Sequence, residues 1–373
     1  MVFIAVLTIP LSAATDLGLS RAGLTGWILA LYTLPGAFGL WLAMRYRQPL
    51  LLTGNVFAII LFASLAGQVA YADLVGASML AGAVVAVLGA FGITGRLSRW
   101  MPSQVVLGLL AGAVVPFVVR VFGVMDGQPL VVGAAFIAYL VARRYVAAES
   151  TAVLPAVVVG LIVAAVSGNL GPLPSLAAPE IALVPPTISV GVVLTVTPVL
   201  VALMTLQANV PSAVFLRGQG YRHPDRAVDL VSGVGTIAAS ALGPTAVSIP
   251  LPVLPLLGGP DAGVPGGRFR AAVTAGVALV VIGLGFAVAE GLAEFVPPQL
   301  LLALAGLALF TVLTRTLLAV ARGPLVVGPL LAFVVAQSDL SVGGLGPFFW
   351  ALVIGVAASL LLEHDKLDQA HAS

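Results

Sequence analysis

The chain has 373 residues, of which 60% are hydrophobic and only 8% are charged, and its formal net charge is +2. A soluble domain carries about 25% charged residues, so this composition excludes an ordinary soluble protein. The absence of cysteine excludes disulfides, thiol catalysis and thiolate metal sites. The basic residues lie in short loops rather than in one patch, so we expect no nucleic-acid partner.

Apolar runs of about 20 residues recur along the whole chain, and each is typical of a membrane-spanning helix. The first run lacks the basic n-region of a signal peptide, so we expect it to be the first membrane helix. In chain order we predict about fourteen helices: 1–15, 23–44, 55–70, 74–95, 103–124, 128–147, 152–170, 187–208, 224–241, 249–258, 269–292, 298–320, 323–338 and 344–362. The predicted fold is therefore one all-α integral membrane domain covering residues 1–373.

Charged residues separate the loops into two sets. Cytoplasmic loops are enriched in Lys and Arg. The basic residues that end even-numbered helices are Arg45, Arg47, Arg96, Arg99, Arg143, Arg144, Arg217, Arg222, Arg226, Arg268, Arg270, Arg315, Arg322 and Lys366. Only Arg21 and Arg120 fall on the other side, whose loops carry Asp73, Asp126, Glu180, Glu290, Glu294 and Asp339. The pattern predicts an even number of spans, with both termini cytoplasmic.

Two stretches in the middle and late chain are nearly the same. "WMPSQVVLGLLAG" (100–112) and "FVPPQLLLALAG" (295–306) place Pro102 and Pro297 195 positions apart. A shift of seven helices reverses orientation, so the first copy follows arginines and the second follows glutamates. We predict a 7+7 inverted repeat, approximately 1–175 and 185–364, which is typical of secondary transporters with a midplane substrate site. Chance similarity in a chain rich in Ala, Gly, Val and Leu is the alternative.

The third and tenth segments are interrupted. The third, "RYRQPLLLTGNVFAII", contains a proline and then Thr-Gly-Asn, and the tenth, "GPTAVSIPLPVLPLLGG", contains four prolines. Prolines remove backbone donors and break helices. We expect each segment to be a short extended strand followed by a half-helix, the second starting at Pro250. Two such N-termini meeting in mid-membrane favour a bound carboxylate. The predicted substrate-binding residues here are Thr53, Gly54, Asn55, Thr245 and Ser248.

Helix 8 and helix 9 add polar candidates. Gln207 and Asn209 precede Pro211, either as substrate-binding residues or as interfacial residues that close helix 8. Asp229, near the start of helix 9, is the best candidate for proton coupling, with a solvated helix end as the alternative. The three histidines lie in a loop and the tail, so we expect no metal site or cofactor. No catalytic motif is present, which predicts that the protein is not an enzyme.

Several stretches together resemble the benzoate:proton symporter family. They are "RYRQP", "GRLSRWMPSQVVLGLLAG", "LQANVPSAVFLRGQGYRHP", "GGPDAGVPGGRFRAAVTAGV", "LLLALAGLALF" and "GPFFWALVIG". The resemblance covers nearly the whole chain. It implies the fourteen-helix fold of nucleobase and sulfate transporters, with core segments 1–4 and 8–11 and gate segments 5–7 and 12–14. It also implies proton-driven import of an aromatic carboxylate.

The sequence departs from this family where the substrate would bind. Family members tend to carry a histidine and an asparagine where this chain has Thr245 and Ser248, and a Trp-containing stretch where it has residues 53–55. The Gln-Asn pair before the helix 8 proline becomes Gln207-Ala208-Asn209, so only Asn209 matches. The resemblance therefore supports the fold more strongly than it supports benzoate as the substrate.

We expect a secondary active transporter that imports a small organic anion, benzoate or a related aromatic carboxylate, by proton symport with alternating access. Its partners would be the anion, protons and the lipid bilayer, with a homodimer also considered because related folds often dimerise. One alternative is an inorganic oxyanion or nucleobase transporter of the same fold. Another is an anion channel or uniporter, which the scarcity of intramembrane acids favours.

Overall fold

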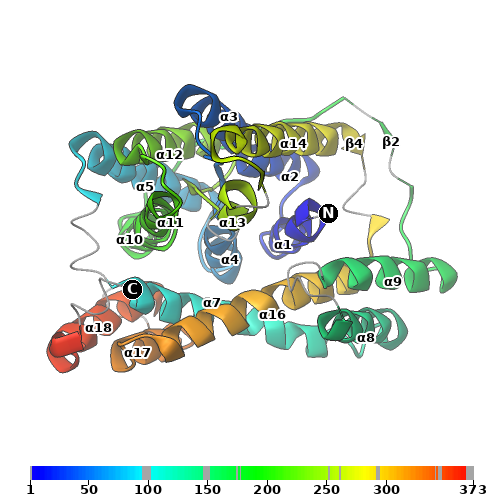
Figure 1. Cartoon of the computed structure of the whole chain (residues 1–373). Helices are drawn as coiled ribbons and strands as arrows, with labels where there is room; N and C mark the ends of the chain where they lie inside the picture. The colour runs from blue at the N-terminus through cyan, green and yellow to red at the C-terminus, as the bar shows by residue number, and fades with distance from the viewer. Residues whose placement is uncertain are drawn as a thin grey trace.

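The helices of the protein lie in two layers, as Figure 1 shows for the computed structural model. The structure describes residues 2–94, 102–145, 152–173, 175–176, 178–250, 253–259, 262–290, 295–340, 342 and 347–366. The first layer contains α1 (Val2–Asp16), α2 (Arg21–Ile28), α3 (Leu34–Tyr46), α4 (Val56–Ser64), α5 (Tyr71–Phe91), α10 (Val190–Met204), α11 (Val210–Gly218), α12 (Asp225–Ser240), α13 (Leu254–Gly258) and α14 (Phe269–Val288). The second layer contains α7 (Ser103–Gly123), α8 (Pro129–Tyr145), α9 (Val153–Val166), α16 (Pro298–Arg322), α17 (Val327–Ala336) and α18 (Pro347–Leu362).

Length and composition make several of these helices suitable for crossing a membrane. Within the described residues, six are long and apolar enough: Arg21–Tyr46, Tyr71–Phe91, Gln104–Gly123, Val190–Arg217, Pro265–Val288 and Pro298–Arg322. Three shorter apolar helices are Val153–Val166, Val327–Ala336 and Pro347–Leu362. Many of their apolar side chains are exposed, which is the arrangement expected of surfaces that face lipid rather than water.

Two of the long helices contain a π-helical turn directly before a proline. The turn η1 (Leu29–Thr33) joins α2 to α3, and η3 (Thr205–Asn209) joins α10 to α11. In η3, the Val210 amide donates to the carbonyl of Thr205, five residues earlier. The wider turn gives Pro211 room without ending the helix, because a proline in a regular α-helix clashes with the preceding turn. The prediction that helix 8 ends near residue 208 is therefore wrong, since the helix continues to Gly218.

A two-stranded antiparallel sheet lies inside the first layer. Its strands are β1 (Thr53–Gly54) and β3 (Val247–Ser248), with Thr53 opposite Ser248 and Gly54 opposite Val247. The nine-residue α4 follows β1, and the five-residue α13 follows β3. The predicted helix start at Pro250 is wrong, because Pro250 lies outside helix and α13 begins at Leu254. Residues 250–255 contain three prolines, which lack the backbone donors of a helix and so explain why the helix begins only at Leu254.

A second strand pair was not predicted. The strand β2 (Ser175–Leu176) pairs with β4 (Ala289–Glu290), which directly follows α14. The predicted helix 269–292 therefore ends early, at Val288. The pairing partner is more than 100 positions away, so no local pattern marks it. Glu294, which the sequence places four positions after Glu290 at the outer end of this helix, lies outside the described residues.

Glycines allow close helix packing at four related places. A Cβ atom added to Gly82 of α5 would lie 2.7 Å from the carbonyl oxygen of Gly233 in α12. One added to Gly36 of α3 would lie 3.1 Å from the carbonyl oxygen of Gly276 in α14. In the second layer, Gly160 of α9 and Gly355 of α18 each leave room for one apolar side chain. An added Cβ would lie 2.6 Å from Leu300 Cδ1 at the first position and 2.6 Å from Val105 Cγ1 at the second.

Candidate functional site

The paired strands lie where η1, η3, α3 and α12 all approach one another. Beyond the paired residues, the Asn55 amide donates to the carbonyl of Ala246 at 2.7 Å. A Cβ atom at Gly54 would lie 2.7 Å from Leu31 Cδ2 and 3.1 Å from the Leu31 carbonyl oxygen. Glycine is therefore needed in β1, because any side chain would push the strand away from η1.

Asn55 joins three elements through its side chain. Its Oδ1 accepts from the Phe57 amide at 2.9 Å and from the Ala58 amide at 3.4 Å, which makes Asn55 the N-cap of α4. Its Nδ2 donates to Ser248 Oγ at 3.0 Å and to the Leu203 carbonyl at 3.4 Å. The buried amide therefore fixes α4 to both β3 and α10.

Asn209 joins η3, β3 and α12. Its Oδ1 accepts from the Ile249 amide at 3.2 Å, just beyond β3. Its Nδ2 donates to Asp229 Oδ1 at 2.9 Å and to Ser232 Oγ at 3.2 Å. Gln207 lies in the same π turn and is also buried. Neither residue closes a helix at a membrane surface, so that interpretation of both is wrong.

Side chains from neighbouring helices hold the chain around β3. The Val247 amide donates to Thr236 Oγ1 at 2.8 Å, and Trp27 Nε1 donates to the Pro244 carbonyl at 2.7 Å. Thr245 is fully buried, and its hydroxyl has no hydrogen-bond partner within the described part of the chain. A buried hydroxyl without a partner is uncommon and indicates a place where a ligand or water could bind.

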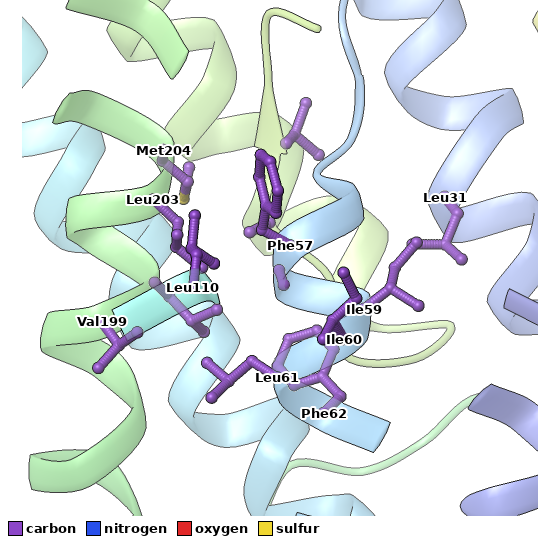
Figure 2. Close-up of a cluster of buried hydrophobic side chains, with 14 of the residues drawn as sticks. Leu31, Phe57, Ile59, Ile60, Leu61, Phe62, Leu110, Val199, Leu203 and Met204 are labelled. Atoms are coloured by element: carbon purple, nitrogen blue, oxygen red, sulfur yellow. The ribbon is translucent and has the colours of Figure 1, made fainter. Parts of the chain in front are cut away.

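Apolar side chains surround the beginning of α4. Figure 2 shows Phe57 between α4 and α10, near Leu203 and Met204, with Leu110 beside them. These four residues are buried, and Leu110 comes from α7 of the second layer. A polar strand pair and an apolar cluster therefore adjoin one another through Asn55 and Phe57.

Asp229 lies on the other side of Asn209 from the strands. It is only 4% exposed, so the interpretation of a solvated helix end is wrong. Its Cβ packs against α5, where a Cβ added to Gly89 would lie 2.7 Å away. A cavity of about 180 Å³ is lined by Gly92, Thr94, Asn209, Val210, Ala213, Arg217, His223, Asp225, Arg226 and Asp229. The hydrogen bond from the Asn209 amide offsets part of the free-energy cost of burying this carboxylate.

One family model matches nearly the whole chain. The sequence model described as "Benzoate membrane transport protein" matches residues 1–361 of this chain. The chain belongs to the benzoate membrane transport protein family. The resemblance inferred from the sequence motifs is therefore confirmed, and with it the transporter class.

Two curated relatives of this family member align over nearly its full length. "Inner membrane protein YdcO" of Escherichia coli (strain K12) is 25% identical over 358 residues, 94% of this chain and 90% of that protein. "Benzoate membrane transport protein" of Acinetobacter baylyi (strain ATCC 33305 / BD413 / ADP1) is 24% identical over 359 residues, 95% of this chain and 90% of that protein. The second relative is named as a membrane transport protein, in agreement with the prediction that this chain is a transporter and not an enzyme.

Two solved structures share the fold. The transmembrane domain of a cyanobacterium bicarbonate transporter, BicA, has a TM-score of 0.53 at 15% identity, covering 99% of this chain and 95% of that one. SLC26A9 has a TM-score of 0.54 at 14% identity, covering 95% of this chain and 65% of that one. The family member is thus a multi-pass, mostly helical membrane protein with the fold of these transporters.

In this family member the structure brings all the residues predicted from the third and tenth segments into one strand pair and its flanks. Gln207 and Asn209 lie beside it in η3, and Asn209 connects it to Asp229. Sequence reasoning missed Trp27, Ser232 and Thr236. A usable signal existed for two of them, because Asp229, Ser232 and Thr236 repeat at three and four positions, which places polar groups on one face of a helix.

A metal centre receives no support from side-chain clustering. Within the described ranges, no group of three or more histidine, aspartate or glutamate side chains is placed to hold a metal ion.

Proposed function

We propose that the protein is a secondary active transporter that imports a small aromatic carboxylate, such as benzoate, by proton symport. The observation that carries this proposal is the contact between the buried Asn55–Ser248 hydrogen bond and the apolar cluster around Phe57. A substrate with one charged end and one flat apolar end matches these two surfaces. Membership of the benzoate membrane transport protein family supports the same substrate class.

The proposed carboxylate position is beside the strand pair. Thr53, Gly54, Asn55, Thr245 and Ser248 would line it, with the unpartnered Thr245 hydroxyl as a donor. Gln207 and Asn209 would border the same space from η3. A hydrogen bond to a charged group contributes about 1.5–3 kcal/mol. Three or four such contacts approach the ~8 kcal/mol that micromolar binding requires, without a buried arginine.

The proposed ring position is the apolar cluster between α4, α10 and α7. Phe57 and Leu203 come from the first layer, and Leu110 comes from the second. An aromatic ring held there would contact both layers at once. Substrate binding would therefore depend on how the two layers are arranged, and this dependence would couple binding to their relative movement.

The proposed inverted repeat, approximately 1–175 and 185–364, is supported by packing as well as by motif. Gly160 and Gly355 are 195 positions apart, and so are their contact partners Val105 and Leu300, with the roles of the two halves exchanged. Gly36 and Gly233, with their partners Gly276 and Gly82, form a second such set in the first layer. Matching contacts at a nearly constant offset are not expected from low sequence complexity alone.

We propose the first layer as the moving core, segments 1–4 and 8–11, and the second layer as the gate, segments 5–7 and 12–14. The two layers of Figure 1 contain these same segments, which supports the division. The full proposal is fourteen spans with both termini cytoplasmic in the inner membrane, as one relative's name indicates for itself. A homodimer through the gate is part of this proposal and is tested by cross-linking in the membrane.

Uptake of labelled benzoate into liposomes tests the function. An inward proton gradient should stimulate the protein-dependent initial rate, measured after subtraction of protein-free vesicles, because neutral benzoic acid also crosses bilayers. Ser248→Ala should weaken binding about fivefold, which corresponds to one net hydrogen bond of about 1 kcal/mol. A matched control is Ser338→Ala, whose hydroxyl forms its hydrogen bonds within its own turn in the described part of the chain. Uptake by the wild-type protein that ignores the gradient would overturn the proposal.

An inorganic oxyanion is the second candidate substrate. It is favoured by the fold match to the bicarbonate transporter domain. Competition separates the candidates: bicarbonate or sulfate should displace bound benzoate only if the apolar cluster contributes little to affinity. Leu110→Ala should weaken benzoate binding severalfold and leave bicarbonate binding unchanged if the ring occupies the cluster.

A further inference from the structure

The cavity beside Asp229 contains ionisable groups that the proposed anion site does not use. It lies where α11, the start of α12 and the end of α5 meet, and its volume is about 180 Å³. This volume is enough to hold several water molecules, and its lining supplies polar partners for them. Asp229 and Asn209 belong to its lining, so the cavity reaches the same asparagine that bonds next to β3.

His223 is the second unusual group in this cavity. Its side chain is only 1% exposed, and its Nδ1 lies 3.0 Å from Asp225 Oδ1. Asp225 also forms an ion pair with Arg217. The other ring nitrogen, Nε2, is buried and has no hydrogen-bond partner within the described residues. Because His223 lines a cavity with room for water, its imidazole is placed to exchange protons with water molecules there.

The ionisable groups around Asp229 are concentrated on the side of the cavity. Arg217 and His223 reach the cavity from α11 and the following loop, and Asp225 and Arg226 reach it from α12. Other elements packed on α12 carry ionisable groups as follows: Tyr71 and Asp73 in the first turn of α5, Arg45 and Tyr46 in the last turn of α3, and Tyr32 in η1. The α5 pair lies at the opposite end of that helix from Gly89, which packs against Asp229. Asp229 is connected to the proposed anion site through Asn209, which also accepts from the Ile249 amide beside β3.

We propose that this cavity is the pathway of the coupling proton, with Asp229 as its carrier and His223 as the group that exchanges it with water. This inference rests on the proposed proton symport. The Asp229 carboxylate binds one proton and becomes a neutral acid. On release, neutral His223 accepts that proton through a cavity water, becomes imidazolium and returns it to water outside the cavity. No other bond is made or broken.

Asn209 provides the link between proton and substrate. One face of its amide donates to the Asp229 carboxylate, and the other accepts from the Ile249 amide beside β3. A hydrogen bond to an ionised carboxylate is stronger than one to a neutral acid. Protonation of Asp229 therefore releases Asn209 from its fixed position, and the backbone next to Ser248 becomes free to adjust to an anion.

Charge also couples the two ligands. The empty core has one negative charge on Asp229, and the loaded core has one negative charge on the substrate and a neutral Asp229. These two states carry equal charge, whereas the states with only one ligand carry either none or two. Movement across the bilayer in the matched states gives electroneutral transport with one proton per anion.

Binding measured against pH tests the proposal in purified protein. Benzoate stays ionised between pH 6 and 8. In the part of this range where Asp229 is ionised in the substrate-free protein, the wild-type Kd for benzoate should rise about tenfold per pH unit. Asp229→Asn mimics the protonated state, so its Kd should stay at the low-pH value throughout. Asp126→Asn, at an exposed turn, is the matched control and should behave as wild type.

His223→Gln separates the carrier from the exchanging group. It should leave the pH dependence of Kd unchanged but slow proton-driven uptake about tenfold, and His364→Gln, at an exposed histidine, is its control. If His223 itself were the carrier, His223→Gln would abolish the pH dependence, and the proposal would be overturned.

A measurement on the wild-type protein alone covers the case in which Asp229→Asn does not fold. Addition of benzoate to unbuffered protein should remove about one proton per bound anion from solution at pH 7.5, detected with a pH dye. Benzoate binding without proton uptake would overturn the inference and leave the proposed substrate intact. Absence of benzoate binding at any pH would overturn the proposed function instead.

Discussion

In the first half of the chain the strand β1 leads into α4, and Asn55, the N-cap of α4, follows β1 directly. The strand β3 leads into α13 in the second half, and its amides are held by Thr236 and Asn209 from other helices. We call β1 with the start of α4 the first half-site, and β3 with its flanking residues the second half-site. The first half-site contains its own helix cap, whereas the second receives its side-chain hydrogen bonds from α12 and η3. In the proposed mechanism the two halves therefore have different roles: β1 would bind the anion, and β3 would respond to the protonation state of Asp229.

The largest expected effect concerns the local half-site. Gly54→Ala should reduce transport more than 100-fold, because the new methyl group would lie 2.7 Å from Leu31 Cδ2 and 3.1 Å from backbone atoms of Leu31. Overpacking of this kind costs about 1–3 kcal/mol in stability and also separates β1 from η1. Liposome uptake and thermal unfolding measure the two effects. Gly133→Ala in α8 is the control, since nothing lies within 4 Å of its added Cβ.

Normal transport by Gly54→Ala would show that β1 is not held against η1 during the cycle. Both half-sites would then tolerate a side chain at the paired position, since Val247, the residue opposite Gly54, already carries one.

The next effect separates the two asparagines. Asn209→Ala should raise the benzoate Kd about 30-fold and abolish its pH dependence, because the Asp229 carboxylate and the Ile249 amide both lose a partner. Each loss of a buried hydrogen bond of this type costs about 1–3 kcal/mol. Asn55→Ala should weaken binding about tenfold and keep the pH dependence, since Asn55 has no contact with Asp229 among its hydrogen bonds. Titration calorimetry at pH 6, 7 and 8 makes the comparison.

Retention of pH dependence in Asn209→Ala would remove the division of roles between the half-sites. Loss of it in both variants would instead place the coupling in the strand pair itself.

The sequence was sufficient to place the two strands, but not their pairing, because Pro49, Gly54 and the prolines of 244–255 are local signals that break helices. It was insufficient for helix 8, since a rule that ends a helix before Pro211 does not foresee a π turn. Burial of Asp229 was also missed. Its burial depends on Asn209, which is 20 positions earlier, and on a glycine of α5, and neither contact leaves a pattern near residue 229.

The smallest effect concerns the second layer. There the first amides of α17 are bonded by a side chain from a distant segment, as the backbone amides at and beside β3 are. The Glu363 carboxylate accepts from the amides of Val326, Val327 and Gly328 at the start of α17. Burial alone would raise the pKa of Glu363, but these three hydrogen bonds hold it below its ordinary value. The carboxylate therefore stabilises the fold at every pH above its unfolded pKa of about 4.3. That contribution is lost as the pH falls through the lower, folded pKa.

Glu363→Gln should lower stability at pH 7 by about 1–2 kcal/mol, the usual contribution of a helix cap. The deficit should shrink as the pH falls below about 4, where the wild-type side chain also becomes neutral. Thermal unfolding in detergent at pH 7 and at pH 4 or lower measures both values, with Asp365→Asn, at an exposed neighbour, as the control. Benzoate binding and its pH dependence should be unchanged, because the cap lies in the second layer. An altered pH dependence in Glu363→Gln would mean that proton coupling is not confined to β3 and α12, and the contrast between the half-sites would have to include α17.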